Sequence, residues 1–262
     1  MHPDLQDVSV VVPAHNAADT IEAAVQSAVA QGGGVEVIVV DDGSVDDTAR
    51  QAARVGARLI RQENGGVASA LNAGVRESTR RFVTFLDADD VLAEGSLAAR
   101  RRAVSAAASP AVVGVPAGLL YEQHTGPVEP DVLASCPLEL SLDFYRSGGF
   151  FPTAYWLMLV DRRRFRFRQP WFKPQLKVAC DYEFYLSVLD RWTVPVVQVP
   201  TVFRRIHPRN LSVSIEGGYA LRDRAVSEVR GVARTFGVAL PERLVPWETR
   251  WHRTALERWF GR

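Results

Sequence analysis

The first 90 residues alternate between short apolar runs and longer segments with one apolar face. Val8 to Val12, Val35 to Val40 and Phe82 to Leu86 are nearly continuous apolar runs rich in β-branched residues. Such runs are typical of parallel strands that are covered on both faces. A shorter strand is predicted over Ala57 to Ile60. The pattern predicts four buried strands in this part of the chain.

Amphipathic segments separate these strands. Apolar residues recur at helical spacing between Ile21 and Val29, and Asp19 and Glu22 have the spacing of a capping box. Further helices are predicted over Asp46 to Val55 and Val67 to Thr79. Strands that alternate with helices of this length predict an α/β fold with a doubly wound, mostly parallel sheet and helices on both faces.

Beyond about residue 110 the alternation fades and aromatic residues gather. A strand is predicted over Ala111 to Val115, a helix over Cys180 to Arg191 and a strand over Val194 to Val199, with a C-terminal helical tail from Tyr219. We therefore expect three parts: residues 1–110 as a first half, residues 111–215 as a smaller second lobe and residues 216–262 as the tail.

Composition and charge narrow the class of protein. At 262 residues, 47% hydrophobic and 23% charged, the chain has globular averages, which excludes disordered, collagen-like and disulfide-scaffold classes. Residues 1–99 hold seven Arg and fifteen Asp or Glu, a formal charge of −8, whereas residues 100–262 carry +9. An acidic half suggests a cation site, and a basic half suggests anionic partners.

The N-terminus and one uncharged stretch bear on where in the cell the protein is expected. The N-terminus has no signal-peptide pattern, and residues 103–121 carry no charge but contain Pro110 and Pro116, which argues against a membrane span. Cys136 and Cys180 lack metal-binding spacing and predict reduced, structural thiols. We expect a cytoplasmic protein, with no nucleic-acid partner.

Polar residues follow three of the predicted strands. The strands run into Pro13-Ala14-His15-Asn16, Asp41-Asp42-Gly43-Ser44 and Asp87-Ala88-Asp89-Asp90. In open α/β sheets ligands bind beyond the carboxyl ends of the strands, where the strand order reverses. We therefore expect five carboxylates to converge on one edge of the sheet.

These carboxylates have both functional and structural interpretations. Asp87 and Asp89, one residue apart, can present hard oxygens to one divalent cation that also binds substrate phosphates. The alternative is that Asp89 and Asp90 cap a helix that begins near Glu94. Asp41 and Asp42 could likewise be turn residues, with the following glycine at positive φ. Repetition of acidic pairs at two strand ends favours a cation, because gathered like charges destabilise the fold unless they are offset.

Four segments together resemble the successive motifs of family-2 glycosyltransferases, inverting enzymes of the GT-A fold. They read VVVPAHN from residue 10, VVDDGSVDDT from residue 39, ENGGVASALNAG from residue 63 and FLDADD from residue 85. The resemblance implies a nucleoside-diphosphate sugar as donor, with a UDP-sugar favoured, and Mn²⁺ or Mg²⁺ bound by an Asp-x-Asp motif.

The resemblance implies that residues 1–110 form the nucleotide-sugar-binding half and residues 111–215 the acceptor-binding, catalytic half. It also implies roles for individual residues. Those placed at the donor are Pro13, His15, Asp41, Asp42, Asn72 and Asp87, and those placed at the metal are Asp87, Asp89 and His207. Pro13, His15, Asp41 and Asp42 stand where the family holds the base and ribose. Leu71 is a departure, since many members have Arg there.

The catalytic base implied by the resemblance is Asp181. It lies in Cys180-Asp181-Tyr182-Glu183, similar to the family's Glu-Asp helix start, with Cys180 in place of the usual Glu. The structural alternative is that Asp181 is a helix N-cap. Arg162 to Arg168 holds five Arg in seven residues, which is typical of a solvated face or an anion-binding patch on the acceptor side.

The expected function is a metal-dependent inverting glycosyltransferase that acts on a saccharide or lipid-linked acceptor in cell-surface polysaccharide or glycoconjugate synthesis. A dinucleotide oxidoreductase is disfavoured because no Gly-x-Gly-x-x-Gly follows the first strand. A non-catalytic sugar- or nucleotide-binding protein on the same fold stays open. Tryptophans and arginines in residues 246–262 suit peripheral contact with the inner face of a membrane, or equally docking on the second lobe or self-association.

Overall fold

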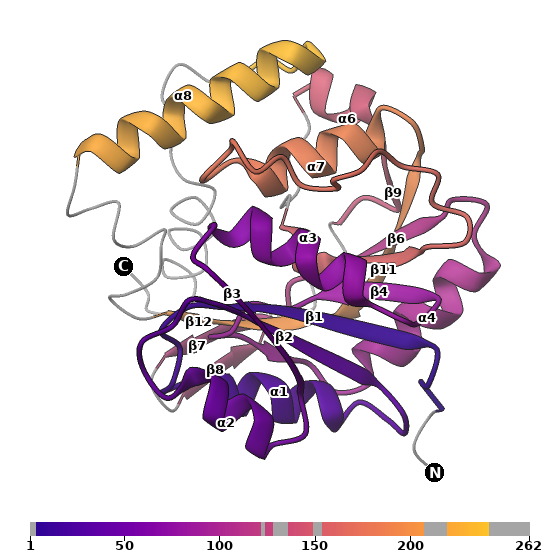
Figure 1. Cartoon of the computed structure of the whole chain (residues 1–262). Coiled ribbons are helices and arrows are strands. Elements are labelled where there is room, and N and C mark those ends of the chain that lie inside the picture. Colours follow the sequence, from indigo (N-terminus) through magenta and orange to yellow (C-terminus); the bar gives the residue numbers. More distant parts are fainter. Residues whose placement is uncertain (1–3, 122–123, 128–135, 149–153, 207–218, 241–262) are drawn as a thin grey trace.

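The computed structural model of the chain describes residues 4–121, 124–127, 136–148, 154–206 and 219–240 (Figure 1). The larger sheet contains β1 (Val8–Ala14), β2 (Glu36–Asp42), β3 (Arg58–Gln62), β4 (Phe82–Phe85), β6 (Ala111–Val115), β9 (Glu139–Leu140), β10 (Met158–Asp161) and β11 (Val194–Pro200). The smaller sheet contains β5 (Val91–Leu92), β7 (Gly118–Tyr121), β8 (His124–Pro127) and β12 (Val202–Ile206). The helices are α1 (Ile21–Val29), α2 (Thr48–Arg54), α3 (Val67–Glu77), α4 (Ser96–Ala106), α6 (Leu142–Arg146), α7 (Cys180–Leu189) and α8 (Tyr219–Phe236).

The larger sheet is mixed but mostly parallel. Its strand order is β3-β2-β1-β4-β10-β6-β11-β9, and β1, β2, β3 and β4 are mutually parallel where they pair. The strand β10 lies antiparallel between β4 and β6. Helices α1 and α2 lie on one face of the sheet, and α3 and α7 on the other (Figure 1). The predicted α/β class, with a mostly parallel sheet and helices on both faces, is confirmed.

The predicted elements of the first 90 residues are all present, with ends displaced by at most two residues. One local detail is wrong. The N-cap of α1 is Thr20, and no side chain caps this helix. Thr20 N and Ile21 N both donate to Ala17 O, at 3.0 and 2.9 Å, so a backbone turn precedes the helix and displaces the expected capping box.

The aromatic residues of the second half pack on the first half. Phe85 of β4 makes edge-to-face contacts with Tyr155, Trp171, Phe172 and Phe184, at centroid distances between 5.3 and 6.5 Å. Such contacts add specific geometry to the burial of large apolar rings. This shared core fixes α7, which carries Phe184, relative to β4 and to the loop that follows it.

The uncharged stretch over residues 103–121 divides among separate elements. It forms the end of α4, then β6 and then β7, as expected from its prolines. Among the helices that the structure describes, none combines the length and apolar character needed to cross a bilayer.

Candidate functional site

The site lies where the strand order reverses. The strands β2 and β4 pair with β1 on opposite sides. After β1 the chain forms β2 and β3 on one side of β1, and it then crosses to the other side to form β4. The carboxyl ends of β1, β2 and β4 therefore meet at a topological switch point, as expected for a ligand site in an open α/β sheet.

Asp41 and Asp42 end β2 and are both buried. Asp41 accepts hydrogen bonds from Ser44 N (3.0 Å) and from Arg61 Nε (3.1 Å). Gly43 has φ +75°, and a Cβ there would lie 3.0 Å from Asn64 N. The positive φ of Gly43 is confirmed, whereas Asp41 and Asp42 are the last two residues of the strand and not turn residues.

Asp42 organises the glycine loop before α3. Its Oδ1 accepts from Gln62 Nε2 (2.7 Å) and Gly65 N (2.8 Å), and its Oδ2 accepts from Gly66 N (2.8 Å). These bonds tie the ends of β2 and β3 to the N-terminus of α3. Contact of Asp41 and Asp42 with a donor stays a prediction.

His15 and two asparagines form an exposed polar edge beside this loop. The Nδ1 atom of His15 lies 2.9 Å from Asp42 O, and Asn64 Nδ2 lies 3.4 Å from the imidazole nitrogens. Asn16 N donates to Ser44 Oγ (2.9 Å). Pro13, by contrast, is buried within β1. The solvent-facing groups here are amide and imidazole groups, which suit recognition of a polar ring.

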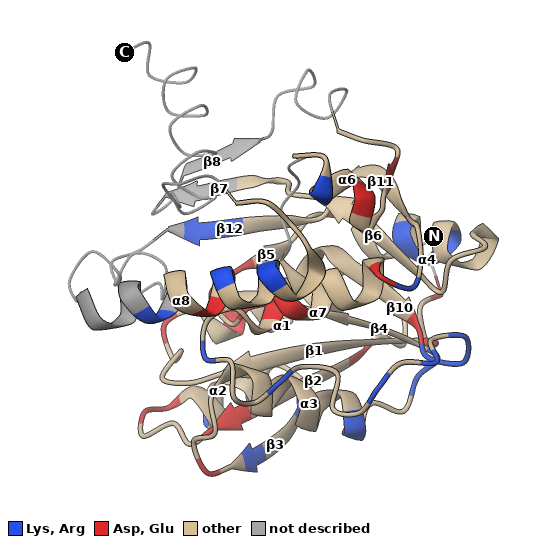
Figure 2. Ribbon diagram, turned by 90° about the horizontal axis from the view of Figure 1, so that it is seen from above, with Lys and Arg blue, Asp and Glu red and all other residues tan. Residues whose placement is uncertain are grey.

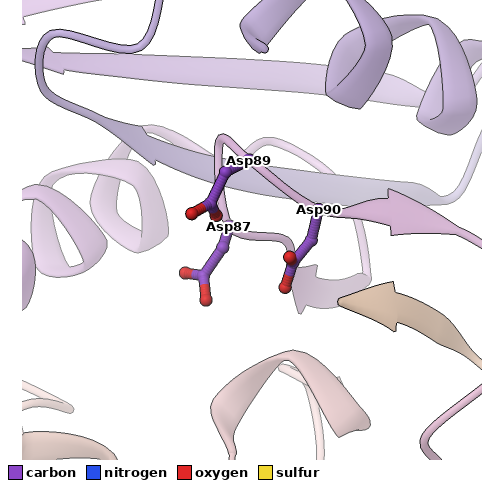
Figure 3. Close-up of side chains that lie close together, drawn as sticks. All are labelled: Asp87, Asp89 and Asp90. Carbon is purple, nitrogen blue, oxygen red and sulfur yellow. The ribbon is translucent and has the colours of Figure 1, made fainter. Parts of the chain in front are cut away.

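The five carboxylates lie at the same edge of the sheet, as expected, because β2 and β4 both run parallel to β1. At that edge they divide into two groups. Asp87, Asp89 and Asp90 form a separate group whose ligand oxygens all lie within 4.8 Å of one another. The physical reason is that the side chains of Asp41 and Asp42 turn into hydrogen bonds with neighbouring loops. Figure 3 shows the three clustered side chains extending from the short loop between β4 and β5 toward the same side.

Asp90 is fully enclosed, and its position contradicts the helix-capping alternative. The following helix α4 begins at Ser96 with Gly95 as N-cap, so neither Asp89 nor Asp90 caps it. Asp90 Oδ1 accepts from Arg205 N (2.8 Å), whereas Oδ2 has no hydrogen-bond partner among the described residues. Burial raises the pKa of Asp90 well above its usual range, and the nearby charges of Asp89 and Asp87 raise it further.

This acidic group fits a divalent cation. Its donors are carboxylate oxygens, which Mg²⁺ and Mn²⁺ prefer. Three carboxylates this close repel one another, and the buried Oδ2 atom of Asp90 lacks a protein partner; a cation would offset both costs. Asp87 and Asp89 are partly exposed and accessible as ligands. Asp90 was missed as a member of the group because its burial is not visible in the sequence.

The strand β12 supports the acidic loop from the other sheet. Arg205 donates from Nε to Asp89 O (3.0 Å), in addition to its backbone bond to Asp90. The basic segment beginning at Arg204 is therefore beside the acidic group. His207 follows directly, but it lies outside the described residues, and its predicted metal contact stays a prediction.

Asp181 lies in the first turn of α7 and is partly buried. The N-cap of this helix is Ala179, so the alternative in which Asp181 is the N-cap is wrong. Its Oδ1 accepts from Tyr182 N (2.6 Å). Negative charge at this end of a helix is stabilised by the helix dipole, and the role of Asp181 as the base stays a prediction.

Tyr155 brings Asp181 into the neighbourhood of the acidic group. Its hydroxyl donates to Asp87 Oδ1. Burial raises the pKa of Tyr155 well above its usual range, and the charges of Asp87, Cys180 and Asp181 add to this effect. The proposed metal ligand and the proposed base thus both lie close to one phenol. Tyr155 was missed because it stands 68 residues from Asp87, outside every motif.

The start of α7 is fixed by a carboxylate from α8. Glu228 accepts hydrogen bonds from the backbone N–H groups of Lys177 (3.2 Å), Val178 (2.9 Å) and Ala179 (3.1 Å). Ala179 is the N-cap of α7, and the other two residues precede it, so this carboxylate holds the segment that leads into the helix. Lys177 also places its Nζ 3.3 Å from Gly65 O, which joins the start of α7 to the glycine loop.

Two further motif positions have structural partners. Leu71 is fully buried in the core. Asn72 exchanges two hydrogen bonds with the backbone of Phe172, at 2.7 and 3.0 Å. These bonds anchor the segment before α7 on α3, and direct contact of Asn72 with the donor stays a prediction. Cys180 is buried, and burial raises the pKa of its thiol, in line with a structural cysteine.

The arginine-rich run is only partly a solvated face, since Arg163 and Arg166 are exposed while other members bind the protein. It follows β10, at the amino end of β4, where Figure 2 shows blue loops beside β4 and β10. Arg164 donates to Val104 O (3.1 Å) and Ala107 O (2.8 Å) at the end of α4, and Arg168 pairs with the buried Glu183. Backbone carbonyl groups and a buried carboxylate therefore bind the guanidinium groups of Arg164 and Arg168. This segment lies at the edge of the sheet opposite to the acidic group.

Comparison with known sequences finds a matching family and several relatives. Residues 9–122 match the family described as Glycosyl transferase family 2. The succinoglycan biosynthesis protein ExoO of Rhizobium meliloti is 33% identical over 195 residues, which cover 70% of this chain and 56% of ExoO. ExoU of the same organism is 43% identical over 97 residues, which cover 35% of this chain and 28% of ExoU. The chain thus spans about a quarter to a half of these relatives.

Solved structures share the fold. The structure of S. aureus TarS 1-349 in complex with UDP-GlcNAc superposes with a TM-score of 0.66 at 18% sequence identity, over 90% of this chain and 68% of that chain. The complex of TarS 1-349 with UDP gives a TM-score of 0.62 over 93% of this chain and 77% of that chain. The mixed sheet described above is therefore the GT-A-like arrangement seen in TarS.

Proposed function

Because this chain belongs to glycosyl transferase family 2 through its residues 9–122, we propose that it is a metal-dependent, inverting glycosyltransferase. It moves a sugar from a nucleoside-diphosphate sugar to a hydroxyl acceptor. The observation that carries the proposal is the group Asp87, Asp89 and Asp90 at the switch point of the sheet, with Asp181 near the same phenol as Asp87.

The donor lies across the ends of β1, β2 and β4. Its base and ribose lie over the ends of β1 and β2, where Pro13, Asp41 and Asp42 are buried. The exposed His15 imidazole and Asn64 amide offer hydrogen bonds there. Its diphosphate lies toward Asp87 and Asp89. A UDP-sugar is the favoured donor, and the crystallisation of TarS 1-349 with UDP-GlcNAc supports this choice.

The reaction is a single displacement. Asp181 accepts the proton of the acceptor hydroxyl while its oxygen attacks the anomeric carbon. The bond from that carbon to the diphosphate oxygen breaks, the nucleoside diphosphate leaves with the electron pair, and the configuration inverts. Mn²⁺ or Mg²⁺ bound by Asp87 and Asp89, with His207 as a further ligand, would act as a Lewis acid toward the charge on the leaving group.

The acceptor is a saccharide or lipid-linked saccharide, and the product contributes to polysaccharide or glycoconjugate synthesis. The names of ExoO and ExoU, both succinoglycan biosynthesis proteins, support this class. The proposed location is the cytoplasm, at the inner face of the membrane. Residues 246–262, which we propose as the membrane or self-association segment, lie outside the described residues.

A thermal-shift panel tests donor binding. We expect one nucleoside diphosphate, UDP first among them, to raise the melting temperature with Mn²⁺ and much less without it. Ligand at 100 times its Kd stabilises a folded protein by about 2.7 kcal/mol, which is a shift of several degrees. The ADP, GDP and dTDP complexes are the controls.

The same samples separate an enzyme from a non-catalytic binder. An enzyme releases nucleoside diphosphate slowly from its sugar donor even without acceptor, whereas a binder shows the thermal shift and no release. The absence of a shift with every nucleoside diphosphate in the presence of Mn²⁺ would contradict the proposed function.

A further inference from the structure

Tyr155 is held rigidly beside the acidic group. It lies in the short 3-10 turn Tyr155–Leu157 that leads into β10, and its side chain is 7% exposed. Its ring packs edge-on against Phe85 (centroids 5.8 Å apart) and Phe172 (5.9 Å). The strand β10 pairs antiparallel with β4, and the acidic loop follows β4. The turn before β10 and the acidic loop therefore lie at the same edge of the sheet.

The hydroxyl of this fixed ring donates to Asp87 Oδ1. A partly exposed aspartate on a loop rotates freely about its side-chain torsions unless a partner holds it, and ordering it on cation binding then costs conformational entropy. A hydrogen bond from a rigid, buried phenol reduces that cost in advance. It engages one of the two carboxylate oxygens, which sets the orientation of the whole group.

We propose that Tyr155 is a positioning residue for the cation site: its hydroxyl fixes the carboxylate of Asp87 in the orientation in which it binds the metal and, through it, the donor diphosphate. This inference rests on the proposed function. It assigns a part in building the cation site to the turn before β10, which lies outside the family match at residues 9–122.

Loss of a residue that hydrogen-bonds to a metal ligand typically lowers the metal affinity about 10- to 100-fold. Tyr155→Phe keeps the ring and its contacts with Phe85 and Phe172, and removes only the hydroxyl. We therefore expect the variant to bind Mn²⁺ about 10- to 100-fold more weakly in the presence of UDP. The binding of UDP alone, without metal, should equal that of the wild type.

Tyr185 provides a matched control. It is fully buried, and its hydroxyl has no hydrogen-bond partner within the part of the chain that the structure describes. Tyr185→Phe therefore removes the same atom from an equally buried ring without touching the acidic group. Its Mn²⁺ affinity should equal that of the wild type.

The experiment measures free Mn²⁺ by electron paramagnetic resonance during titration of each protein with MnCl2 at saturating UDP. A double-mutant cycle with Asp87→Asn adds a second test, because Tyr155→Phe should have almost no further effect once Asp87 has lost its charge. Thermal melts of all variants report folding independently of metal.

The outcomes are distinguishable. Equal Mn²⁺ affinity of wild type and Tyr155→Phe overturns the inference and leaves the proposed function standing. Equal losses in Tyr155→Phe and Tyr185→Phe, or additive effects in the cycle with Asp87→Asn, also overturn it, since they indicate general loosening of the core. A wild-type protein that binds no Mn²⁺ with any nucleoside diphosphate overturns the proposed function itself.

Discussion

Replacement of Asp181 by Asn is expected to lower the turnover number for sugar transfer by about 10² to 10⁴, the usual contribution of a general base. The amide keeps the size of the side chain but cannot take the proton of the acceptor hydroxyl. Because Asp181 lies at the start of α7 and not on the donor edge formed by β1 and β2, the Kd of the nucleotide with Mn²⁺ should stay within about twofold of the wild-type value.

The measurement is the initial rate of transfer to acceptor, with nucleotide affinity determined separately by calorimetry. Asp190→Asn is the control, since Asp190 is the exposed C-cap residue of the same helix and lies at its opposite end. Near-normal transfer by Asp181→Asn would show that another group takes the proton. A joint loss of transfer and nucleotide binding would place Asp181 at the donor instead.

Replacement of Asp89 by Asn is expected to weaken Mn²⁺-dependent binding of the nucleoside diphosphate by about 10²-fold or more. The change removes a charged oxygen from the acidic group, and loss of a direct ligand should exceed the 10- to 100-fold effect of removing an outer partner. Transfer should fall in parallel, because the charge that develops on the leaving diphosphate is no longer offset.

The same variant should behave differently without metal. The charge of Asp89 is one cause of the raised pKa of Asp90, so removing it relieves repulsion, and the melting temperature of the metal-free protein should not fall. Asp47→Asn, which removes an exposed charge near the start of α2, is the control and should change neither quantity. Unchanged nucleotide affinity of Asp89→Asn with Mn²⁺ would remove Asp89 from the metal site.

Most of the architecture of the first 90 residues was predictable because β1, β2 and β4 are almost completely buried and so appear as apolar runs. The position of β10 was not. Its apolar residues, Met158, Leu159 and Val160, do not indicate the direction of the strand or its neighbours, and its antiparallel insertion between β4 and β6 depends on long-range pairing. Packing of the aromatic residues of the second half on Phe85 of β4 depends on such pairing too.

The candidate site was predictable where chemistry is contiguous in sequence and not where the fold assembles it. Asp87 and Asp89 stand together as expected. The other features of the site depend on contacts between segments far apart in the chain. These are the bonds of Asp42 to the glycine loop, the enclosure of Asp90, the contact of Tyr155 with Asp87 and the bonds of Glu228 to the residues before α7. Lys177, one of two lysines, was visible by its rarity, but only the fold places it beside Gly65.

The most direct test of the account is a crystal of the protein grown with UDP and MnCl2, with diffraction data collected at the manganese absorption edge. The account predicts an anomalous peak at about 2.0 to 2.6 Å from carboxylate oxygens of Asp87 and Asp89, the range of hard cations with oxygen ligands, and bridged to the diphosphate. Bound UDP without such a peak, or a peak elsewhere with both aspartates turned into bonds with their own backbone, would contradict it.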